Sequence, residues 1–551
     1  MTTRKAKPSG KRAAKKKAKP PARAKGSRAT SKKTANSLRV RMYRVGFGDF
    51  FLVIVPTSEH GDQYILIDCG VFKGTSGTGD IGSIVECVED MHKTTDGKLA
   101  LVIMTHRHAD HIAGFSKAPI FKDFEAGMVW MPYWEQFNDK EKEPAHKLQL
   151  DAMVANLTSV ALQLQKPNVD SKEVLNKLGQ VSAVPTQDEN SAHNLLVNID
   201  DLAAQMAIQF RSREDDEGRE ALAQLGNATG IEDFNAAATD KKKRGGNAAA
   251  LDLLKNHLGK DGKNVRYYAA NDKPELPPEL DELKATILGP PPEKAKAFLA
   301  LMDLKKGVGQ YLDSTTGDDG RVSTIQPFPD EWLAVDLQKE YRQEEAKWPI
   351  DFEVVKGEVG QSQPDMLVAA ASKIENFLNN QSLVVLFEFG GKRLLFAGDA
   401  QGGNWEYWLY KTDAPTKDPT EAGEIIEKSK ELLETIDFYK VGHHGSTNAT
   451  PIQAVEAAIG RPKSSHGFVS MCSTEFGVYG NVDKKTEVPR KPLMDVLEKD
   501  SWLIRSDAIE ITITDPETKK ETKIASREGV SLPEPKVGTI TKSSLYLEYS
   551  F

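Results

Sequence analysis

The sequence predicts an α/β protein. Short apolar runs of the kind that form buried strands recur along the chain, as at residues 99–104 and 394–397. Elsewhere apolar residues repeat at helical spacing, as at residues 150–164. The 551 residues are 39% hydrophobic, enough for a large core. No apolar stretch approaches the ~20 residues that a membrane helix needs, so we expect no membrane contact.

The elements can be placed in chain order. Alternation at Val40, Met42 and Val45, then apolar runs at 50–55 and 64–68, predict an antiparallel start to a sheet. The remaining strands of the core are expected at 99–104, 127–132, 265–268, 283–289, 394–399, 437–441, 467–471 and 502–504. Helices are expected at 451–459 and 492–497, and alternating runs at 509–513 and 544–549 predict exposed or edge strands.

Residues 1–37 differ from the rest of the chain. They contain 14 Lys or Arg and no Asp or Glu, so the net charge of −7 divides into +14 for this tail and −21 for the body. With almost no large apolar residues, the tail is expected to be disordered. A nucleic-acid-binding arm, a solubilising tail and an organelle transit peptide remain open, but without a hydrophobic region it is no secretory signal.

The body, residues 38–551, is expected to form one domain with two helical insertions, at about 140–262 and 293–375. These insertions either cap a site or pack against a sheet edge and mediate assembly. The three cysteines, Cys69, Cys87 and Cys472, argue against a disulfide framework and fit a reducing, cytoplasmic location. We interpret Cys69 as a small buried hydrophobic residue.

One run of residues predicts chemistry. His106, His108, Asp110 and His111 fall within six positions, although the chain has only 11 histidines. Imidazoles and a carboxylate are the ligands that suit zinc, manganese or iron. The cluster follows the apolar run 99–104, so it is expected on the loop at the carboxyl end of a buried strand, where open α/β sheets build their sites.

This cluster resembles the His-x-His-x-Asp-His signature of the metallo-β-lactamase superfamily. Further resemblances follow in the family's order, at Asp68-Cys69-Gly70, Gly398-Asp399 and His443-His444-Gly445-Ser446. The Val-Gly-x-Gly-Asp run at 45–49 and the Asn-x-Ser-Leu-Val run at 380–384 are similar to the metallo-hydrolase domain of ComEC-type DNA-uptake competence proteins and their soluble relatives.

The resemblance implies an αββα sandwich with two divalent metal ions between its sheets, most fittingly zinc, with manganese or iron as alternatives. In that reading, His106 and His108 hold one metal, Asp110 and His111 the other, and Asp399 bridges them. Asp68 orients a ligand from the second layer. Asp110 and Lys440 become the candidate catalytic residues, Lys440 by stabilising developing negative charge or remaining a solvated strand-end lysine.

The family's third histidine motif is missing. His146, His193 and His257 lie in helical or loop segments of the insertion and are interpreted as ordinary histidines. Asn379-Asn380-Gln381-Ser382 stands at the expected place. Either His443 and His444 serve one metal each, or the first metal is held weakly.

The sequence therefore leads to a functional hypothesis with two alternatives. The resemblance and the basic tail favour a hydrolase that uses a metal-bound hydroxide on phosphodiester bonds of nucleic acid. The acidic body favours instead a small ester, lactone or phosphocholine-type substrate, because it would repel a long polyanion. The third reading is a catalytically inactive nucleic-acid-associated protein. Protein partners are not predicted.

Overall fold

The protein is described from a computed structural model. It divides by contacts into Met1–Asn36 and Ser37–Phe551. The structure describes residues 37–72, 83–136, 224, 227, 246–300, 375–410, 426–446, 449–451, 468–479, 487–508, 511–514, 521–524 and 530–551. The predicted tail lies outside them except for Ser37. Two mixed sheets and the helices packed on them confirm the α/β class.

The larger sheet has eight strands in the order β15-β16-β1-β2-β3-β4-β5-β6. Strands β15 to β3 are antiparallel and β3 to β6 are parallel, as the expected antiparallel start requires. Their bounds are β1 Arg39–Tyr43, β2 Phe50–Thr57, β3 Gly61–Cys69, β4 Lys98–Ile103, β5 Glu125–Pro132, β6 Val265–Tyr268, β15 Thr539–Lys542 and β16 Tyr546–Ser550.

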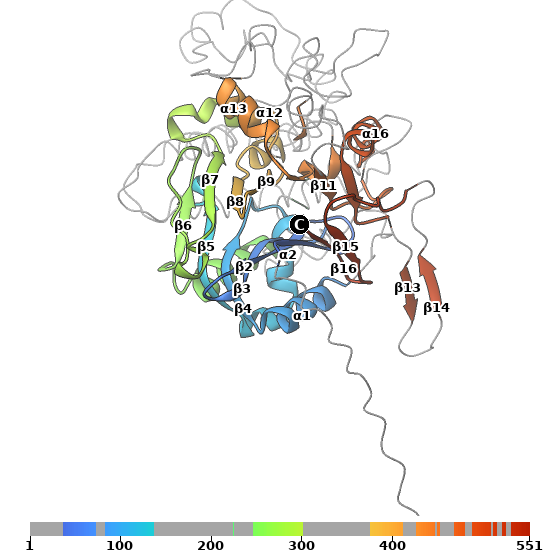
Figure 1. Cartoon of the computed structure of the whole chain (residues 1–551). Helices are drawn as coiled ribbons and strands as arrows, with labels where there is room; N and C mark the ends of the chain where they lie inside the picture. Colours follow the sequence, from blue (N-terminus) through green and yellow to red (C-terminus); the bar gives the residue numbers. More distant parts are fainter. Residues whose placement is uncertain are drawn as a thin grey trace, which may run out of the picture. The chain divides into compact units, whose positions relative to one another are not determined.

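The smaller sheet has six strands in the order β12-β11-β10-β9-β8-β7. Here β7 to β9 are antiparallel and β9 to β12 are parallel. The bounds are β7 Lys284–Gly289, β8 Val384–Phe389, β9 Lys392–Phe396, β10 Phe438–Lys440, β11 Val469–Cys472 and β12 Trp502–Arg505. A separate hairpin joins β13 Ile511–Thr514 to β14 Glu521–Ile524 (Figure 1).

The two sheets share one hydrophobic core. Val53 of β2, Ile103 of β4, Phe387 of β8 and Phe438 of β10 all belong to it. A strand in this position is buried on both faces, because neighbouring residues point to opposite sides. In β4, Ile103 faces the shared core while Val102 faces the helices behind the sheet. This explains why the sequence shows continuous apolar runs instead of strict alternation.

Helices cover the other face of each sheet (Figure 1). Behind the larger sheet lie α1 Ile84–Thr95, α2 Ala109–Lys117, the short η1 Pro119–Asp123, α8 Gly246–Asp252 and the π-helical η4 Leu253–Leu258. Behind the smaller sheet lie α12 Gly402–Leu409, α13 Glu427–Glu434 and α16 Lys491–Asp500. Other short helices of the described part of the chain are η2 Tyr133–Glu135, η5 Pro278–Leu280, η6 Glu293–Ala300 and η8 Gly442–Gly445.

Several expectations change in detail. The run at 544–549 forms β16, which lies between β15 and β1 with Leu547 and Tyr549 buried, so it is no edge strand. Of the first insertion, the described segment 246–258 is helical and packs behind the larger sheet. The predicted helix at 451–459 lies outside the described residues apart from Pro451. Among the described helices, none has the length and apolar character to cross a membrane.

Candidate metal centre

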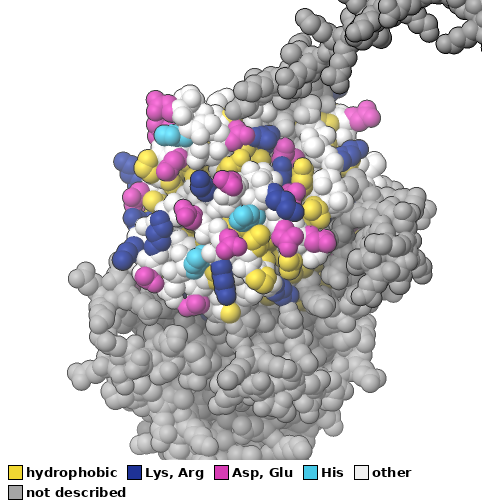
Figure 2. All heavy atoms as spheres, turned by 90° about the horizontal axis from the view of Figure 1, so that it is seen from below, with side chains coloured by type: hydrophobic (Ala, Val, Ile, Leu, Met, Phe, Trp, Pro, Cys, Tyr) yellow, Lys and Arg dark blue, Asp and Glu magenta, His cyan; other side chains and the backbone are white. Residues whose placement is uncertain are grey.

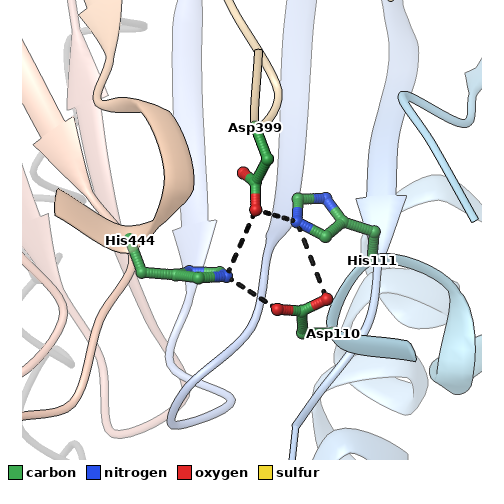
Figure 3. A group of neighbouring side chains, drawn as sticks. All are labelled: Asp110, His111, Asp399 and His444. Carbon is green, nitrogen blue, oxygen red and sulfur yellow. Dashed lines mark hydrogen bonds and ion pairs between the residues drawn. The ribbon is translucent and has the colours of Figure 1, made fainter. Parts of the chain in front are cut away.

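The predicted ligands meet where strands of both sheets end. In the larger sheet, β4 ends at Ile103 and the chain passes through the histidine loop into α2, whose first turn carries Asp110 and His111. The expectation that all four cluster residues lie on a loop is therefore correct only for His106 and His108. In the smaller sheet, Asp399 follows β9 closely and His444 follows β10. Figure 3 shows the side chains converging.

Asp110, His111, Asp399 and His444 form a fully buried group whose ligand atoms lie within 4.8 Å of one another. His111 Nε2 lies 3.0 Å from Asp399 Oδ2, and His444 Nε2 lies 3.0 Å from Asp110 Oδ2. His444 Nε2 lies 3.8 Å from Asp399 Oδ2, and His111 Nε2 lies 3.9 Å from Asp110 Oδ1.

These distances suit one four-coordinate ion. Four ligand atoms at ~2.0–2.2 Å from a tetrahedral zinc are about 3.3–3.6 Å apart, which lies between the short and long edges found here. Asp110 Oδ1, His111 Nε2 and Asp399 Oδ2 are also buried and, apart from the ion pair between His111 and Asp399, have no hydrogen-bond partner among the described residues. Buried polar atoms are otherwise almost always paired, so the residues present fit a bound cation.

A second group consists of His106, His108 and Asp110. His106 Nε2 lies 3.0 Å from His108 Nδ1, and both side chains are buried. Asp110 thus belongs to both groups, and the expectation that Asp399 bridges two ions remains a prediction. The side chains of both groups are of the kinds that could hold a metal ion.

Neighbouring groups orient the imidazoles of His111 and His444 through hydrogen bonds. The Nδ1–H of His111 donates to Asp68 Oδ2 over 2.8 Å, and the Nδ1–H of His444 donates to the Ser473 carbonyl over 2.9 Å. Each bond leaves Nε2 with a lone pair facing the group, as a metal ligand requires. Asp68 also accepts from the backbone N–H and the hydroxyl of Thr105, at 2.7 and 2.6 Å. The expected second-layer place of Asp68 therefore fits its contacts.

Lys440 is buried beside this group and forms an ion pair with Asp49. Its ammonium also donates to the Gly398 carbonyl over 3.0 Å and to Asp399 Oδ1 over 3.3 Å. An ammonium has three donors, so these three acceptors use all of them. Lys440 is thus not a solvated strand-end lysine, and its catalytic role remains a prediction. It holds Asp399, and Asp49 is a partner that sequence reasoning missed.

The centre has an excess of carboxylate charge. Asp49, Asp68, Asp110 and Asp399 are all buried there. Burial alone would lower the pKa of His111, but Asp399, Asp68 and Asp110 raise it well above its ordinary value. Burial would raise the pKa of Asp399, and His111 and Lys440 instead hold it well below its ordinary value. The group retains negative charge that a divalent cation would neutralise.

The surroundings of His106 and His108 lower their pKa values, in contrast to His111. Burial, together with the neighbouring His111 and His108, lowers the pKa of His106 well below its ordinary value. Burial also lowers the pKa of His108, although Asp110 opposes this. Both imidazoles are therefore neutral near pH 7, which is the form that binds a metal.

His443 does not join either group. Its Nε2 lies 3.5 Å from Glu375 Oε1 and 4.0 Å from Asp399 Oδ2, and Gln401 contacts its Nδ1 at 3.2 Å. Burial would lower its pKa, but Asp399 and the bond to Glu375 raise it to about 9. The structure thus gives the consecutive histidines different places, and the idea that each serves one metal remains a prediction.

The backbone around the centre is constrained. Asp68, His443 and His444 have φ values of 55°, 46° and 52°, in the left-handed region that such residues rarely adopt. Conformations of this kind collect at functional sites, where the surrounding packing holds them. Gly70 has a different role. A Cβ there would lie 2.1 Å from the backbone carbon of Asp110, so only glycine lets α2 approach β3.

The segment 379–382, which stands where the third motif was expected, makes structural contacts. Ser382 Oγ accepts from the Asp399 backbone N–H over 3.2 Å, and the Leu383 N–H donates to the Thr105 carbonyl over 2.9 Å. Segment 379–382 therefore links the loops that carry ligands from the two sheets. Among the alternative histidines, His257 is exposed on η4, as an ordinary histidine should be, while His146 and His193 lie outside the described residues.

A small pocket, with room for about one water molecule, lies beside Asp110 and His443. Its other lining residues are Phe47, Phe72, Gln224, Asn227, Glu375, Tyr479 and Val488. Asp110 belongs both to this pocket and to the metal-binding group.

Comparison with known proteins adds no assignment: no protein-family model and no curated protein matches the chain.

Proposed function

We propose that this protein is a metal-dependent hydrolase of the metallo-β-lactamase type that cleaves phosphodiester bonds. The observation that carries the proposal is the buried group of Asp110, His111, Asp399 and His444, with inward atoms that lack hydrogen-bond partners. The two sheets packed on one core, with helices on their outer faces, support the same class. The sequence motifs add the resemblance from which the substrate class is taken.

The proposed metal ligands fall into two groups. Asp110, His111, Asp399 and His444 would hold one ion, and His106, His108 and Asp110 a second. When bound, divalent metals supply Lewis acidity and bring the pKa of water towards neutrality.

Around the ions, Asp68 fixes the ring of His111, and Lys440 fixes the carboxylate of Asp399. His443 lines the pocket and can donate a hydrogen bond to a substrate oxygen. Phe47 packs on His444 with ring centroids 4.3 Å apart and keeps water from that side.

The distribution of charged side chains on the surface affects how a nucleic acid could bind. On the face that carries α1, seen in Figure 2, described Lys and Arg side chains are interspersed with Asp and Glu and form no continuous basic patch. For a nucleic acid, the 14 cations of residues 1–37 would be a source of the electrostatic attraction that this face does not offer. A hydrolase of small esters or lactones is the second candidate, favoured by the narrow pocket and the acidic body.

The test is a substrate panel with the full chain reconstituted with zinc or manganese. The panel contains labelled single-stranded DNA and RNA, bis(p-nitrophenyl) phosphate, a lactone and p-nitrophenyl phosphorylcholine. Phosphodiester turnover that Asp110→Ala and His444→Ala each reduce at least a thousandfold supports the proposal. His257→Ala, an exposed histidine, is the matched control and should retain full activity. Turnover confined to the lactone or to phosphorylcholine would instead support the second candidate.

Deleting residues 1–36 separates binding from catalysis. Turnover of bis(p-nitrophenyl) phosphate should be unchanged, while affinity for DNA should fall and lose its dependence on salt. Unchanged DNA binding by the shortened chain would remove the role of the tail.

A further inference from the structure

The first insertion reaches the backbone of the metal-binding residues. Asn227 and Asn247, two described residues of the insertion, are buried and bond to the loop and helix that carry the ligands. Beside them, α8 and η4 pack on α2, and Ala250 and Leu254 are buried in the same cluster as Ile112. This part of the insertion is therefore built into the core next to the metal-binding residues.

Asn227 accepts from a backbone donor in the first turn of α2. The first N–H groups of a helix have no partner within it, and the side chain of the N-cap residue usually accepts from one of them. The N-cap of α2 is His108, whose side chain makes no such bond and belongs to a metal-binding group. The Asp110 N–H donates to Asn227 Oδ1 instead, over 3.1 Å. A residue 117 positions further along the chain thus fixes the backbone of the ligand that both groups share.

The side-chain amide of Asn247 joins this contact to the histidine loop. Its Nδ2 donates to the Arg107 carbonyl over 2.9 Å and to the Asn227 carbonyl over 3.2 Å, so each of its two hydrogens has an acceptor. Arg107 stands between the candidate ligands His106 and His108. The bond from Asn247 therefore holds the stretch of backbone that carries both imidazoles.

The side chain of Arg107 is held as well. Its guanidinium donates to the Glu135 carboxylate at 2.7 and 2.8 Å, and Lys255 of η4 donates to the Glu135 carbonyl over 3.2 Å. The insertion thus reaches the histidine loop directly through Asn247 and indirectly through Lys255 and Glu135. Ligands held in place before an ion arrives lose less freedom when it binds, which raises the affinity for the ion.

We propose that Asn227 and Asn247 are positioning residues of the metal centre, through which the first insertion sets the affinity of the chain for its metal ion. The inference rests on the metal ligands of the proposed function and gives the insertion a role that the sequence left open. The coupling is reciprocal: if the docked insertion strengthens metal binding, the bound metal stabilises docking of the insertion by the same factor. Both directions can be measured without a substrate.

The first experiment measures the zinc affinity of the full chain by competition with a chelator, and the visible absorption of the cobalt(II)-loaded chain, which reports the geometry of the ligands. Asn227→Leu and Asn247→Leu replace the amide by an apolar group of similar size, and each should weaken zinc binding about 10–100-fold and change the cobalt spectrum. Asn227→Asp keeps an acceptor for the Asp110 N–H and should retain both properties. Leu254→Ala, the matched control, removes buried packing of the insertion without touching these bonds. It should lose stability but keep its zinc affinity and cobalt spectrum.

The second experiment uses the wild-type chain, so it does not depend on whether the variants fold. Hydrogen exchange is compared between the zinc-loaded and the metal-free protein. Exchange in α8 should become faster once zinc is removed, with little change in α1, which packs behind the same sheet. Equal changes in α1 and α8, or no change in either, would overturn the coupling.

The outcomes separate this inference from the proposed function. Wild-type zinc affinity and an unchanged cobalt spectrum in Asn227→Leu and Asn247→Leu would overturn it, even in a chain that hydrolyses phosphodiesters. An equal loss of zinc affinity in Leu254→Ala would also overturn it, since packing alone would then explain the effect. A wild-type chain that binds no metal would overturn both. Metal binding that depends on the two asparagines, in a chain without phosphodiesterase activity, would support the inference and count against the proposed function alone.

Discussion

Replacing Lys440 by methionine tests what the buried ammonium does. Lys440 is 2% exposed, is ion-paired with Asp49 and bonds to Asp399. The variant keeps the length of the side chain and leaves two buried carboxylates without their cation. Removing one partner of a buried ion pair costs about 3–5 kcal/mol. We expect a loss of that size in the free energy of unfolding of the metal-free chain.

The measurement is urea unfolding followed by circular dichroism. Asp49→Asn and the double variant complete a mutant cycle, and the double variant should be more stable than the sum of the two single losses predicts, by about 1–3 kcal/mol. Lys392→Met is the matched control. Its ion pair with Asp437 is partly exposed, with side chains 33% and 19% accessible, so the loss should stay within about 1 kcal/mol.

Zinc should reduce the loss in Lys440→Met, because a bound cation also neutralises Asp399. A Lys440→Met chain as stable as Lys392→Met, with only its turnover impaired, would refute the reasoning and support instead the predicted role of Lys440 in stabilising developing negative charge.

Three further predictions concern the surroundings of the centre. Asp68→Asn presents an amide to His111 Nδ1 and should weaken zinc binding about 10–100-fold in a competition titration with a chelator; unchanged affinity would remove its orienting role. Gly70→Ala should lower both stability and zinc occupancy, since its Cβ would collide with the backbone of Asp110; a normally loaded, stable variant would contradict this. Burial would raise the pKa of Glu135, but Arg107, bonded at 2.7 and 2.8 Å, lowers it. Because the folded pKa lies below the unfolded value of ~4.3, this stabilisation is present above that pH and is lost as the pH falls through the folded pKa. The stability gap between wild type and Glu135→Gln should therefore narrow below about pH 4 in unfolding titrations; a constant gap would contradict the pairing.

Most strands could be predicted because each is buried on both faces and leaves an apolar run. The helix α1 was not predicted, although Ile84, Cys87, Val88 and Met91 stand at helical spacing and are buried. The helix α12 gave a weaker signal, since it begins with two glycines and is stabilised by packing of Trp405 and Leu409 behind the smaller sheet. Local pattern therefore found strands better than helices.

Residue type and the order of the motifs were enough to predict from the sequence that Asp110, His111, Asp399 and His444 belong to the candidate site. The sequence showed Asp49 only as the last residue of the run at 45–49. Its ion pair with Lys440 could not be predicted, because the two residues are far apart in the sequence and meet only in the fold. His443 looked equivalent to His444, and the tight backbone between them turns the two rings to different neighbours.

Zinc stoichiometry is the most direct test of the central claim. The full chain is dialysed against zinc and its metal content is measured by mass spectrometry, beside Asp110→Ala, Asp399→Ala and the control His257→Ala. The account predicts at least one tightly bound ion per chain in wild type and His257→Ala. It predicts that this ion is lost from both aspartate variants while circular dichroism shows them folded. Wild-type protein without stoichiometric metal, or aspartate variants that retain it, would contradict the claim that these residues form a metal centre.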